Sequence, residues 1–295
     1  MVNTRIITQE IEYFEPGNIQ EALELLDRYG PDAKIIAGGT DLLVQLKLKT
    51  VSPRFLISVR KIPELNIIEN GTSLRIGAAV LLCDVLNACT EDGKYSALHE
   101  AVQSMATVHI RNMGTIGGNL CNASPAADSA PPLLALDAQV RICGLKSERI
   151  LALSEFFKDV NCIAMDYNEI LKEIEIPPLP EATGSAFLNN SKLGSDISKV
   201  SASAFIKREG DDCTVCRIAL GSVAPTPIRS IRTEEFLIGK QLDDQVLEEA
   251  GKKVAEEIKP ITDIRSTARY RKRVVAVLVN DVLKKAWQRS GAYKP

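Results

Sequence analysis

Residues 108–137 read VHIRNMGTIGGNLCNASPAADSAPPLLALD, and the six residues at the centre of this stretch decide the fold. The segment Gly114-Thr115-Ile116-Gly117-Gly118-Asn119 holds three glycines and two small polar residues. Glycine lets the backbone turn through positive φ and lets a ligand approach the main chain without a Cβ between them. Successive N–H groups in such a turn can converge on an anion. We therefore interpret this segment as a candidate phosphate-binding loop.

A second loop of the same character lies upstream. Ala37-Gly38-Gly39-Thr40-Asp41 follows the apolar pair Ile35-Ile36, which is typical of the end of a strand. Two such loops suit a ligand with two adjacent phosphates and long organic arms, such as a dinucleotide. Neither loop has the G-x-G-x-x-G or G-x-x-x-x-G-K-[ST] spacing, so the Rossmann and P-loop folds lack their signatures. An ordinary tight turn is the commoner use of a Gly-Gly pair, so that alternative stays open at this point.

The composition narrows the functional classes. The 295 residues carry 36 Lys and Arg against 38 Asp and Glu, a net charge of −2, and 5% aromatic residues. Because there is no basic excess, we predict neither nucleic acid nor an anionic membrane as a partner. No apolar run reaches 18 residues, and the N-terminus lacks a basic region followed by an apolar core. We therefore expect a cytoplasmic protein without a membrane span.

Residue types that ligate metals or act as nucleophiles are sparse. The seven cysteines have no framework spacing and are interpreted as reduced thiols. The two histidines, His99 and His109, stand on separate segments, and no nucleophile–histidine–acid set is recognisable. We predict no metal site and no catalytic residue in this chain.

Periodicity and turn residues organise the first half of the chain. Asn18 with Glu21 predicts the start of a helix, which Gly30-Pro31 ends. We predict a buried strand over residues 34–37 and a hairpin at Asn70-Gly71. No regular element is assigned to residues 1–12.

Pro177-Pro178-Leu179-Pro180 marks a boundary, because proline can neither donate to a strand ladder nor continue a helix. Beyond it, two strand-like runs surround residues 209–212, and amphipathic helices are predicted near 244–258 and 266–289. The second half therefore predicts an antiparallel sheet with helices packed on it. Cys213 and Cys216 lie three apart on one of these strands, so we expect them on opposite faces, as packing thiols.

The two glycine loops are accompanied by further residues in a recognisable order. Ala37–Asp41 and Ile110–Asn119 are followed by Asp128 and by PPLLALDA at residues 131–138. This set resembles the FAD-binding medium subunits of the molybdenum hydroxylases, the family of xanthine and carbon monoxide dehydrogenases. The likeness runs from about Tyr13 to the C-terminus. The bacterial xanthine dehydrogenase FAD subunit also has a counterpart of the APTPIR segment at 224–229.

The resemblance implies an α+β fold in two domains. A FAD-binding domain of the PCMH type would span residues 1–177, with a small βαβ-like lobe over about 1–60 and a larger mixed lobe over 61–177. A smaller domain, an antiparallel sheet with helices, would span residues 181–295. The sequence has no insertion and only Cys121 between Asn119 and Asp137, so we predict no iron–sulfur cluster in this chain.

The resemblance also implies the function of an electron-transfer subunit. FAD, bound non-covalently, would pass electrons from [2Fe–2S] clusters of a small partner subunit to NAD or another acceptor. A large partner subunit would hold molybdopterin and oxidise a purine or another N-heterocycle, in a dimer of heterotrimers. Two alternatives remain from the sequence: a stand-alone flavin reductase, and a nucleotide-binding scaffold without turnover.

The same resemblance assigns the FAD site. Backbone N–H groups of the first loop would meet one part of the pyrophosphate, and those of Thr115, Ile116, Gly117 and Gly118 the other part or the ribityl chain. Asp128 would bond the adenosine side, or alternatively cap the helix that opens near residue 130. The full set is Ala37, Gly38, Gly39, Thr40, Asp41, Thr115, Ile116, Gly117, Gly118, Asn119, Asp128, Leu171, Asn189 and Lys192.

Two of these positions carry an open alternative. Leu171 matches an apolar residue against FAD in relatives, and it is equally well explained as strand core. Asn189 stands where many relatives place a lysine that touches FAD, and Lys192 falls near a later arginine of the same motif. An amide stabilises a reduced, anionic flavin less than a cation does, so we expect a lower flavin potential than in lysine-bearing relatives. Lys192 could instead swing in and restore the charge.

Overall fold

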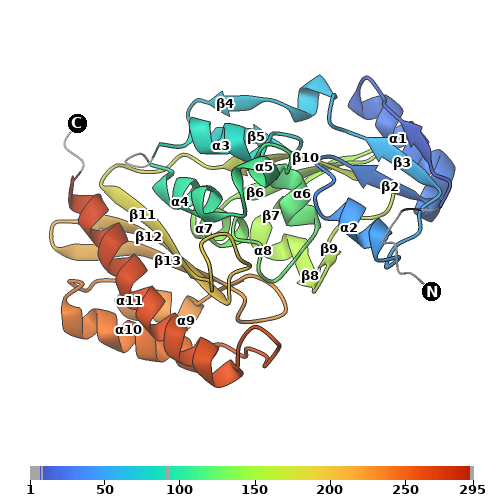
Figure 1. The fold of residues 1–295 in the computed structure, drawn as a ribbon. Helices are drawn as coiled ribbons and strands as arrows, with labels where there is room; N and C mark the ends of the chain where they lie inside the picture. The colour runs from blue at the N-terminus through green and yellow to red at the C-terminus, as the bar shows by residue number, and fades with distance from the viewer. Residues whose placement is uncertain (1–6, 8, 91–93, 293–295) are drawn as a thin grey trace.

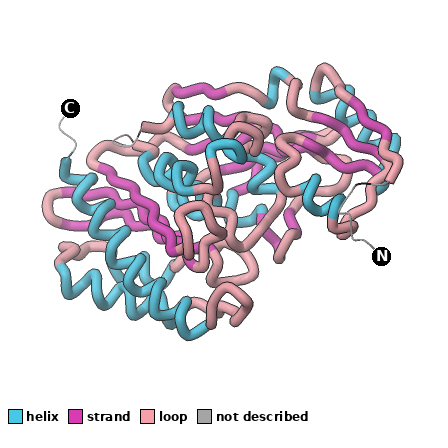
Figure 2. Tube along the Cα trace, viewed as in Figure 1, coloured by secondary structure: helices cyan, strands magenta, loops and turns pink. Residues whose placement is uncertain are grey.

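The computed structural model describes residues 7, 9–90 and 94–292, and within them the chain forms an α+β fold with three main sheets (Figures 1 and 2). The expected fold class is confirmed. Most of the segment 1–12, to which no regular element was assigned, lies outside the described residues. No helix in the described part of the chain is long and apolar enough to cross a membrane.

The first lobe is a three-stranded parallel sheet in the order β1-β3-β2. Its helix α1 begins with a reciprocal cap: Asn18 Oδ1 accepts from the Glu21 N–H at 2.9 Å, and Glu21 Oε2 accepts from the Gly17 N–H at 2.8 Å. Such a cap stabilises a helix by about 1 kcal/mol. The elements are β1 (Glu12–Phe14), α1 (Ile19–Tyr29), η1 (Gly30–Asp32), β2 (Ala33–Ile36), α2 (Leu42–Lys47) and β3 (Phe55–Ser58).

Strand β2 differs from the expectation of a buried strand. Only Ala33 is buried, Lys34 is exposed, and Ile35 and Ile36 are half-buried. The reason is its position, because β2 is an edge strand and its side chains line the cavity described below. The apolar residues of β2 therefore face a space that a ligand can fill.

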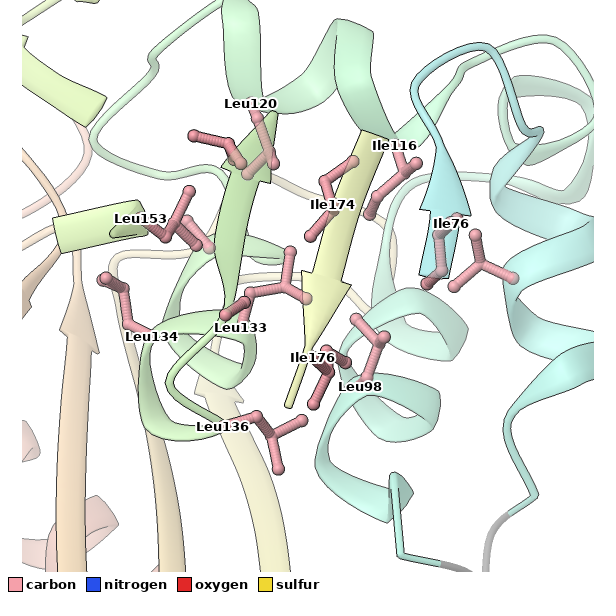
Figure 3. Packing of buried hydrophobic residues seen from close by; sticks show 14 of the residues in the cluster. Ile76, Leu98, Ile116, Leu120, Leu133, Leu134, Leu136, Leu153, Ile174 and Ile176 are labelled. Carbon is pink, nitrogen blue, oxygen red and sulfur yellow. The ribbon is translucent and has the colours of Figure 1, made fainter. Parts of the chain in front are cut away.

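The second lobe is a five-stranded antiparallel sheet in the order β4-β5-β10-β6-β7. Helices cover one of its faces, and Figure 3 shows Ile116, Leu120 and Leu133 packed against Ile174 of the sheet. The elements are η2 (Pro63–Leu65), β4 (Ile68–Asn70), β5 (Leu74–Gly77), α3 (Leu82–Ala88), α4 (Ser96–Ser104), α5 (Val108–Arg111), α6 (Ile116–Cys121), α7 (Ala130–Ala135), β6 (Gln139–Cys143), β7 (Glu148–Ala152), α8 (Leu153–Phe156), β8 (Phe157–Asp159), β9 (Cys162–Ile163) and β10 (Ile170–Ile176).

The C-terminal part is a four-stranded antiparallel sheet in the order β11-β12-β13-β14. Its core lies between the sheet and the helices α10 and α11, and α11 runs across the sheet in Figure 1. The proline-rich segment 177–180 connects β10 to β11. The elements are β11 (Thr183–Asn190), β12 (Val200–Glu209), β13 (Asp212–Gly221), β14 (Ile228–Arg229), α9 (Ile231–Leu237), α10 (Asp244–Glu257) and α11 (Ala268–Ala292).

One half-buried carboxylate ties this sheet to the second lobe. Glu100, on α4, accepts from the backbone N–H of Phe187 on β11 at 2.8 Å. It also accepts from Arg289 and Lys285 of α11, each at 2.7 Å. Burial alone would raise the pKa of Glu100, but these donors outweigh it and leave the pKa below its usual value. The contact fixes how β11, which carries Asn189, sits against α4.

The expectation that Cys213 and Cys216 point to opposite faces is wrong. Strand β13 has a β-bulge: Cys216 pairs with Ile206 and Cys213 with Arg208, so that Thr214 is the extra residue. The bulge turns both thiols into the same core, where both are buried and unbridged. The neighbouring Cys213 thiol, together with burial, raises the pKa of Cys216. The two residues are packing thiols, as expected, but on one face.

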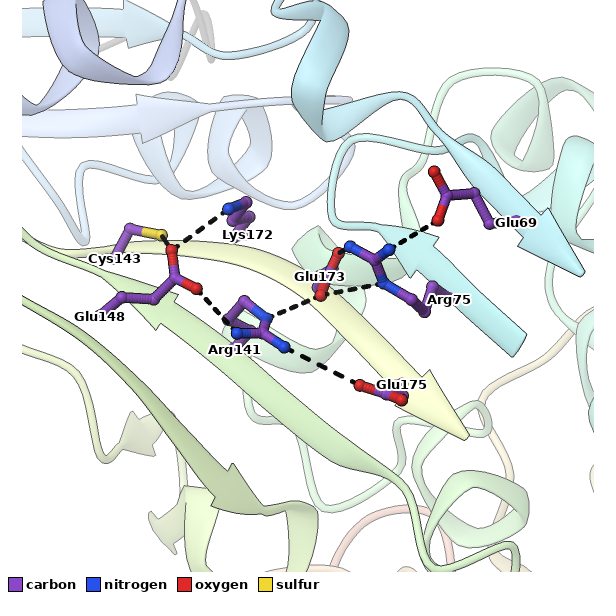
Figure 4. Close-up of polar contacts among 8 residues, drawn as sticks. All are labelled: Glu69, Arg75, Arg141, Cys143, Glu148, Lys172, Glu173 and Glu175. Carbon is purple, nitrogen blue, oxygen red and sulfur yellow. Dashed lines mark hydrogen bonds and ion pairs between the residues drawn. The ribbon is translucent and has the colours of Figure 1, made fainter. Parts of the chain in front are cut away.

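The face of the second sheet opposite its helices carries a charged ladder (Figure 4). Glu173, whose side chain is 1% exposed, accepts from Arg75 Nη2 and from Arg141 Nε, both at 2.7 Å. Arg141 also donates to Glu148 at 2.8 Å, and this bond is the main reason that the pKa of Glu148 is lowered to about 2. Burial raises the pKa of Glu173, but the two guanidinium groups outweigh it and the net shift is downward.

Replacing Glu173 with glutamine should lower the free energy of unfolding by about 2–4 kcal/mol at neutral pH, because two guanidinium groups lose a shared, buried partner. The folded-state pKa lies below the 4.5 of a free glutamate, so this stabilisation is present above pH 4.5 and is lost as the pH falls below it. Urea unfolding of both proteins at neutral and acid pH measures the difference. Glu175→Gln is the matched control, since Glu175 is 31% exposed and lies 4.0 Å from Arg141. Equal losses for both variants would contradict the prediction.

Candidate functional site

The two glycine loops, more than seventy residues apart in the sequence, meet in space. A Cβ on Gly38 would lie 2.1 Å from the Met113 carbonyl oxygen and 2.8 Å from Gly114 Cα. Any side chain larger than hydrogen at position 38 would therefore collide with the backbone of the second loop. A Cβ on Gly114 would in turn lie 3.6 Å from Thr40 Oγ1. The loops thus form one continuous backbone surface.

The first loop offers free donors. The N–H groups of Gly38, Gly39 and Thr40 have no acceptor among the residues that the structure describes. All three residues line a cavity, and Thr40 also carries a hydroxyl group. Unpaired N–H groups at the wall of a cavity are costly unless water or a ligand accepts from them. The first loop is therefore suited to hold an anion, as expected.

The second loop is organised differently from the expectation. Residues 116–121 form helix α6, and Thr115 caps it by accepting from the Gly118 N–H at 3.0 Å. The N–H groups of Ile116 and Gly117 donate to the carbonyls of Val80 and Ala78, each at 3.0 Å.

Of the four N–H groups expected to meet the ligand, only that of Thr115 has no partner within the described residues. The Thr115 hydroxyl, having accepted from Gly118, still has its own proton to donate. Ile116 is fully buried, with its side chain in the core of Figure 3. Gly117 is required by its neighbour, because a Cβ there would lie 2.5 Å from the Ala78 oxygen. The second loop contributes shape and one or two donors to the site.

The cavity has a volume of about 740 Å³ and runs past both loops. This lies within the range of about 300–1,000 Å³ that is usual for small-molecule sites. Expected site residues outside its lining are Ile116, Asn189 and Lys192. Those that line it are Ala37, Gly38, Gly39, Thr40, Asp41, Thr115, Gly117, Gly118, Asn119, Asp128 and Leu171.

Two other expected site residues lie in the cavity wall. Leu171 is 4% exposed and belongs to the core cluster as well as to the cavity wall, so its role as strand core is confirmed and its contact with FAD stays a prediction. Asn119 Oδ1 accepts from the Ser129 hydroxyl at 2.6 Å, which leaves its amide Nδ2 without an acceptor among the described residues. Burial raises the pKa of Asp41 at the edge of the first loop.

Asp128 is a residue of the cavity wall whose carboxylate is buried but only partly hydrogen-bonded. It is 6% exposed, and its Oδ2 accepts from Ser198 Oγ at 2.7 Å and from Asn189 Nδ2 at 3.4 Å. Its other oxygen, Oδ1, is buried and has no partner within the described part of the chain. The side chain does not cap α7, so the alternative of a helix cap is wrong. Burial raises the pKa of Asp128, against the opposing effect of its hydroxyl and amide donors.

Asn189 lies behind Asp128 and not in the cavity wall. Its Nδ2 donates to Ser198 Oγ at 2.9 Å and reaches Asp128 Oδ2 and Ser104 Oγ at 3.4 Å. Asp128 and Asn189, which were expected at different ends of the cofactor, are therefore in contact with each other, and the role of each as a site residue stays a prediction. Lys192 is exposed, in the loop between β11 and β12.

Several wall residues were not anticipated. Ser195, Asp196 and Ile197 come from the β11–β12 loop, and Met165 and Tyr167 from the segment before β10. Neither segment has a paired-glycine motif or a charge pattern that marks a site, so these residues could not be found from local sequence. No cluster of three or more potential metal-ligating side chains occurs among the residues described.

Both parts of the chain match models of known protein families. Residues 9–179 match the family model of the FAD binding domain in molybdopterin dehydrogenase. Residues 186–286 match that of the CO dehydrogenase flavoprotein C-terminal domain. Together the two models span most of the chain.

Individual proteins match over nearly their whole length. The chain is 30% identical to the carbon monoxide dehydrogenase medium chain of Hydrogenophaga pseudoflava, covering 96% of this chain and 99% of that one. It is 31% identical to the xanthine dehydrogenase FAD-binding subunit of Escherichia coli O157:H7, covering 95% and 97%. A solved structure of the Hydrogenophaga pseudoflava carbon monoxide dehydrogenase, lacking the Mo-pyranopterin moiety, matches with a TM-score of 0.92 at 30% identity, covering 96% of this chain and 99% of that one.

Proposed function

The chain belongs to the FAD-binding medium subunits of the molybdenum hydroxylases, and from this premise we propose that its cavity holds FAD non-covalently for electron transfer within a larger enzyme. The observation that carries the proposal is the junction of the two glycine loops at the wall of one cavity. A bound FAD would take electrons from [2Fe–2S] clusters of a small partner subunit and deliver them to NAD or another acceptor.

The residues of the cavity fit such a group at two separate points. The free N–H groups of Gly38, Gly39 and Thr40 suit a pyrophosphate, because backbone donors bind phosphate oxygens without a desolvated cation. The unpaired Oδ1 of Asp128 suits a hydroxyl donor, which a ribose or ribityl group supplies. A pyrophosphate and a polyol joined in one molecule satisfy both.

The chain's own residues would bind and orient the cofactor. The hydroxyls of Thr40 and Thr115 would donate hydrogen bonds to phosphate oxygens, and the amide NH₂ of Asn119 would donate a further hydrogen bond to the cofactor. Leu171 would pack against the cofactor and keep water from it. Asp128 Oδ1 would accept a hydrogen bond from a cofactor hydroxyl, while Ser198 donates a hydrogen bond to Oδ2.

We further propose the partners and the substrate class. The large subunit would hold molybdopterin and the small one the [2Fe–2S] clusters, in a dimer of heterotrimers. A purine or another N-heterocycle is proposed as substrate because of the resemblance to bacterial xanthine dehydrogenase.

The proposal is tested by purifying the chain alone and with the large and small subunits. We expect one FAD per chain and no iron in the isolated protein. In the assembled complex, bleaching of the flavin by purines, aldehydes or aromatic acids identifies the substrate, and reoxidation by NAD tests the acceptor. Bound FAD that no substrate bleaches would support the scaffold alternative. Rapid NADH oxidation by the isolated chain would support the flavin reductase.

Asn189 carries a prediction about the flavin potential. We expect that Asn189→Lys raises the potential, because a cation beside Asp128 compensates the carboxylate charge near a reduced flavin. Potentiometric titration of the wild type and the variant measures the shift. Ser191→Lys is the control, since Ser191 is the first residue after β11, the strand that carries Asn189, and does not line the cavity. An unchanged potential in Asn189→Lys would contradict the prediction and would mean that Asn189 lies with Asp128 at the adenosine end of the cofactor, the end that the family resemblance implies for Asp128 alone.

A further inference from the structure

Asp128 belongs to the FAD-binding domain, but the groups that hold it belong to the C-terminal domain. Ser198, which donates to its Oδ2 at 2.7 Å, lies in the β11–β12 loop, two residues before β12 begins. A loop residue keeps a carboxylate in place only if its own backbone is fixed. Two residues, Ser222 and Arg271, fix the backbone around Ser198.

Ser222 provides the first tie. Its hydroxyl donates to the Ser198 carbonyl at 2.9 Å, and its N–H donates to the Pro125 carbonyl at 2.7 Å. Ser222 thus connects Ser198 to the segment of the FAD-binding domain that leads into Asp128. It does so in a left-handed conformation, with φ of 62°, which a serine adopts only when its surroundings require it.

Arg271, in the first turn of α11, provides the second tie. The guanidinium is buried, at 3% exposure, and its Nη1 donates to the carbonyls of both Lys199 and Ser222, the latter at 2.9 Å. Its Nη2 donates to Asp263 Oδ1 at 2.8 Å. One planar group therefore holds the residue next to Ser198 and the residue that bonds Ser198. A lysine, with a single nitrogen, cannot reproduce this fork.

We propose that Arg271 is a positioning residue for FAD binding, which acts through Ser222 and Lys199 on Ser198 and thereby aims Asp128 into the cavity. Arg271 does not line the cavity and has no direct contact with Asp128 within the described residues. The inference rests on the proposed function, because it needs FAD as the ligand of Asp128. It assigns to the C-terminal domain a part in setting the affinity for FAD.

A double-mutant cycle on the full-length chain tests the inference. The apoprotein of the wild type, Arg271→Lys, Ser198→Ala and the double variant is titrated with FAD, and flavin fluorescence gives each Kd. We expect each single change to weaken binding about five- to tenfold, as for the loss of a hydrogen bond to a charged or buried group. The double variant should be no weaker than Ser198→Ala by more than about twofold, because both changes break one chain of contacts.

Arg265→Lys is the matched control. Arg265 also pairs with Asp263, at 3.0 Å, but it is 43% exposed in its side chain and donates to neither carbonyl. We expect its Kd to equal that of the wild type. Thermal unfolding of each apoprotein shows whether a variant is folded, and Ser222→Ala, which removes one hydroxyl, replaces Arg271→Lys in the cycle if that variant unfolds.

The outcomes separate the two proposals. If the wild type and Arg265→Lys bind no FAD, the proposed function is wrong. If both bind FAD but Arg271→Lys does so equally well, the inference about Arg271 is wrong. Losses that multiply in the double variant would also overturn it, because they would mean that Arg271 and Ser198 act on FAD independently.

Discussion

A Gly38→Val protein is expected to lose its FAD. The new Cβ would lie 2.1 Å from the Met113 carbonyl oxygen. Because a Cβ is fixed by its own backbone, no rotation of the side chain relieves this contact. The two loops must separate, which removes the N–H groups of the first loop from the phosphate position. The strain should also lower the free energy of unfolding by about 1–3 kcal/mol. The ratio of flavin absorbance to protein in the purified chain measures the loss.

Two further variants make this result interpretable. Gly194→Val is the control, because a Cβ at Gly194 meets nothing within 4 Å, although its neighbour Ser195 lines the cavity. Gly38→Ala introduces the clashing atom alone and should show the same loss with less strain elsewhere. Circular dichroism must show native helix content in each protein. A folded Gly38→Val chain with a full complement of FAD would refute the role of the loop junction.

Asp128→Asn is expected to weaken FAD binding by about 10- to 100-fold, the range for losing a hydrogen bond to a charged acceptor. The amide can still accept from Ser198 through one oxygen, so the local structure should survive. It would then turn an NH₂ group, and not an acceptor, toward the cofactor hydroxyl. Fluorescence titration of the apoprotein with FAD gives the change in Kd.

Asp166→Asn separates this specific contact from the general charge of the cavity. Asp166 also lines the cavity but is exposed, so its carboxylate is screened by water. We expect its Kd to stay within about twofold of the wild type. A comparable loss of FAD affinity in both variants would contradict the prediction. It would mean that FAD binding depends on the total charge of the cavity and not on a hydrogen bond to Asp128 Oδ1.

Features that depend on neighbouring residues were correctly predicted from the sequence. The cap of Asn18 and Glu21 and the hairpin at Asn70-Gly71 both occur where they were expected. Each needs only a few adjacent residues with suitable donors or a tolerant backbone. The edge strand β7, in contrast, was not predicted, because its apolar residues 150–152 run on into Leu153 without the alternation of apolar and polar residues that marks a half-buried strand.

Features that depend on distant partners were not predicted. The β-bulge that brings Cys213 and Cys216 to one face depends on the pairing of β13 with β12. The engagement of the Ile116 and Gly117 N–H groups depends on Val80 and Ala78, in another segment.

By itself the sequence determined that two glycine-rich backbone segments exist and that they belong to a FAD-binding family, because glycine spacing and order along the chain are local properties. The tertiary structure alone decided which of their N–H groups remain free for a ligand. It also decided that Asp128 is held by Ser198 and Asn189 of the other domain. The physical reason is that a hydrogen-bond donor is available only if no acceptor from elsewhere in the fold reaches it first.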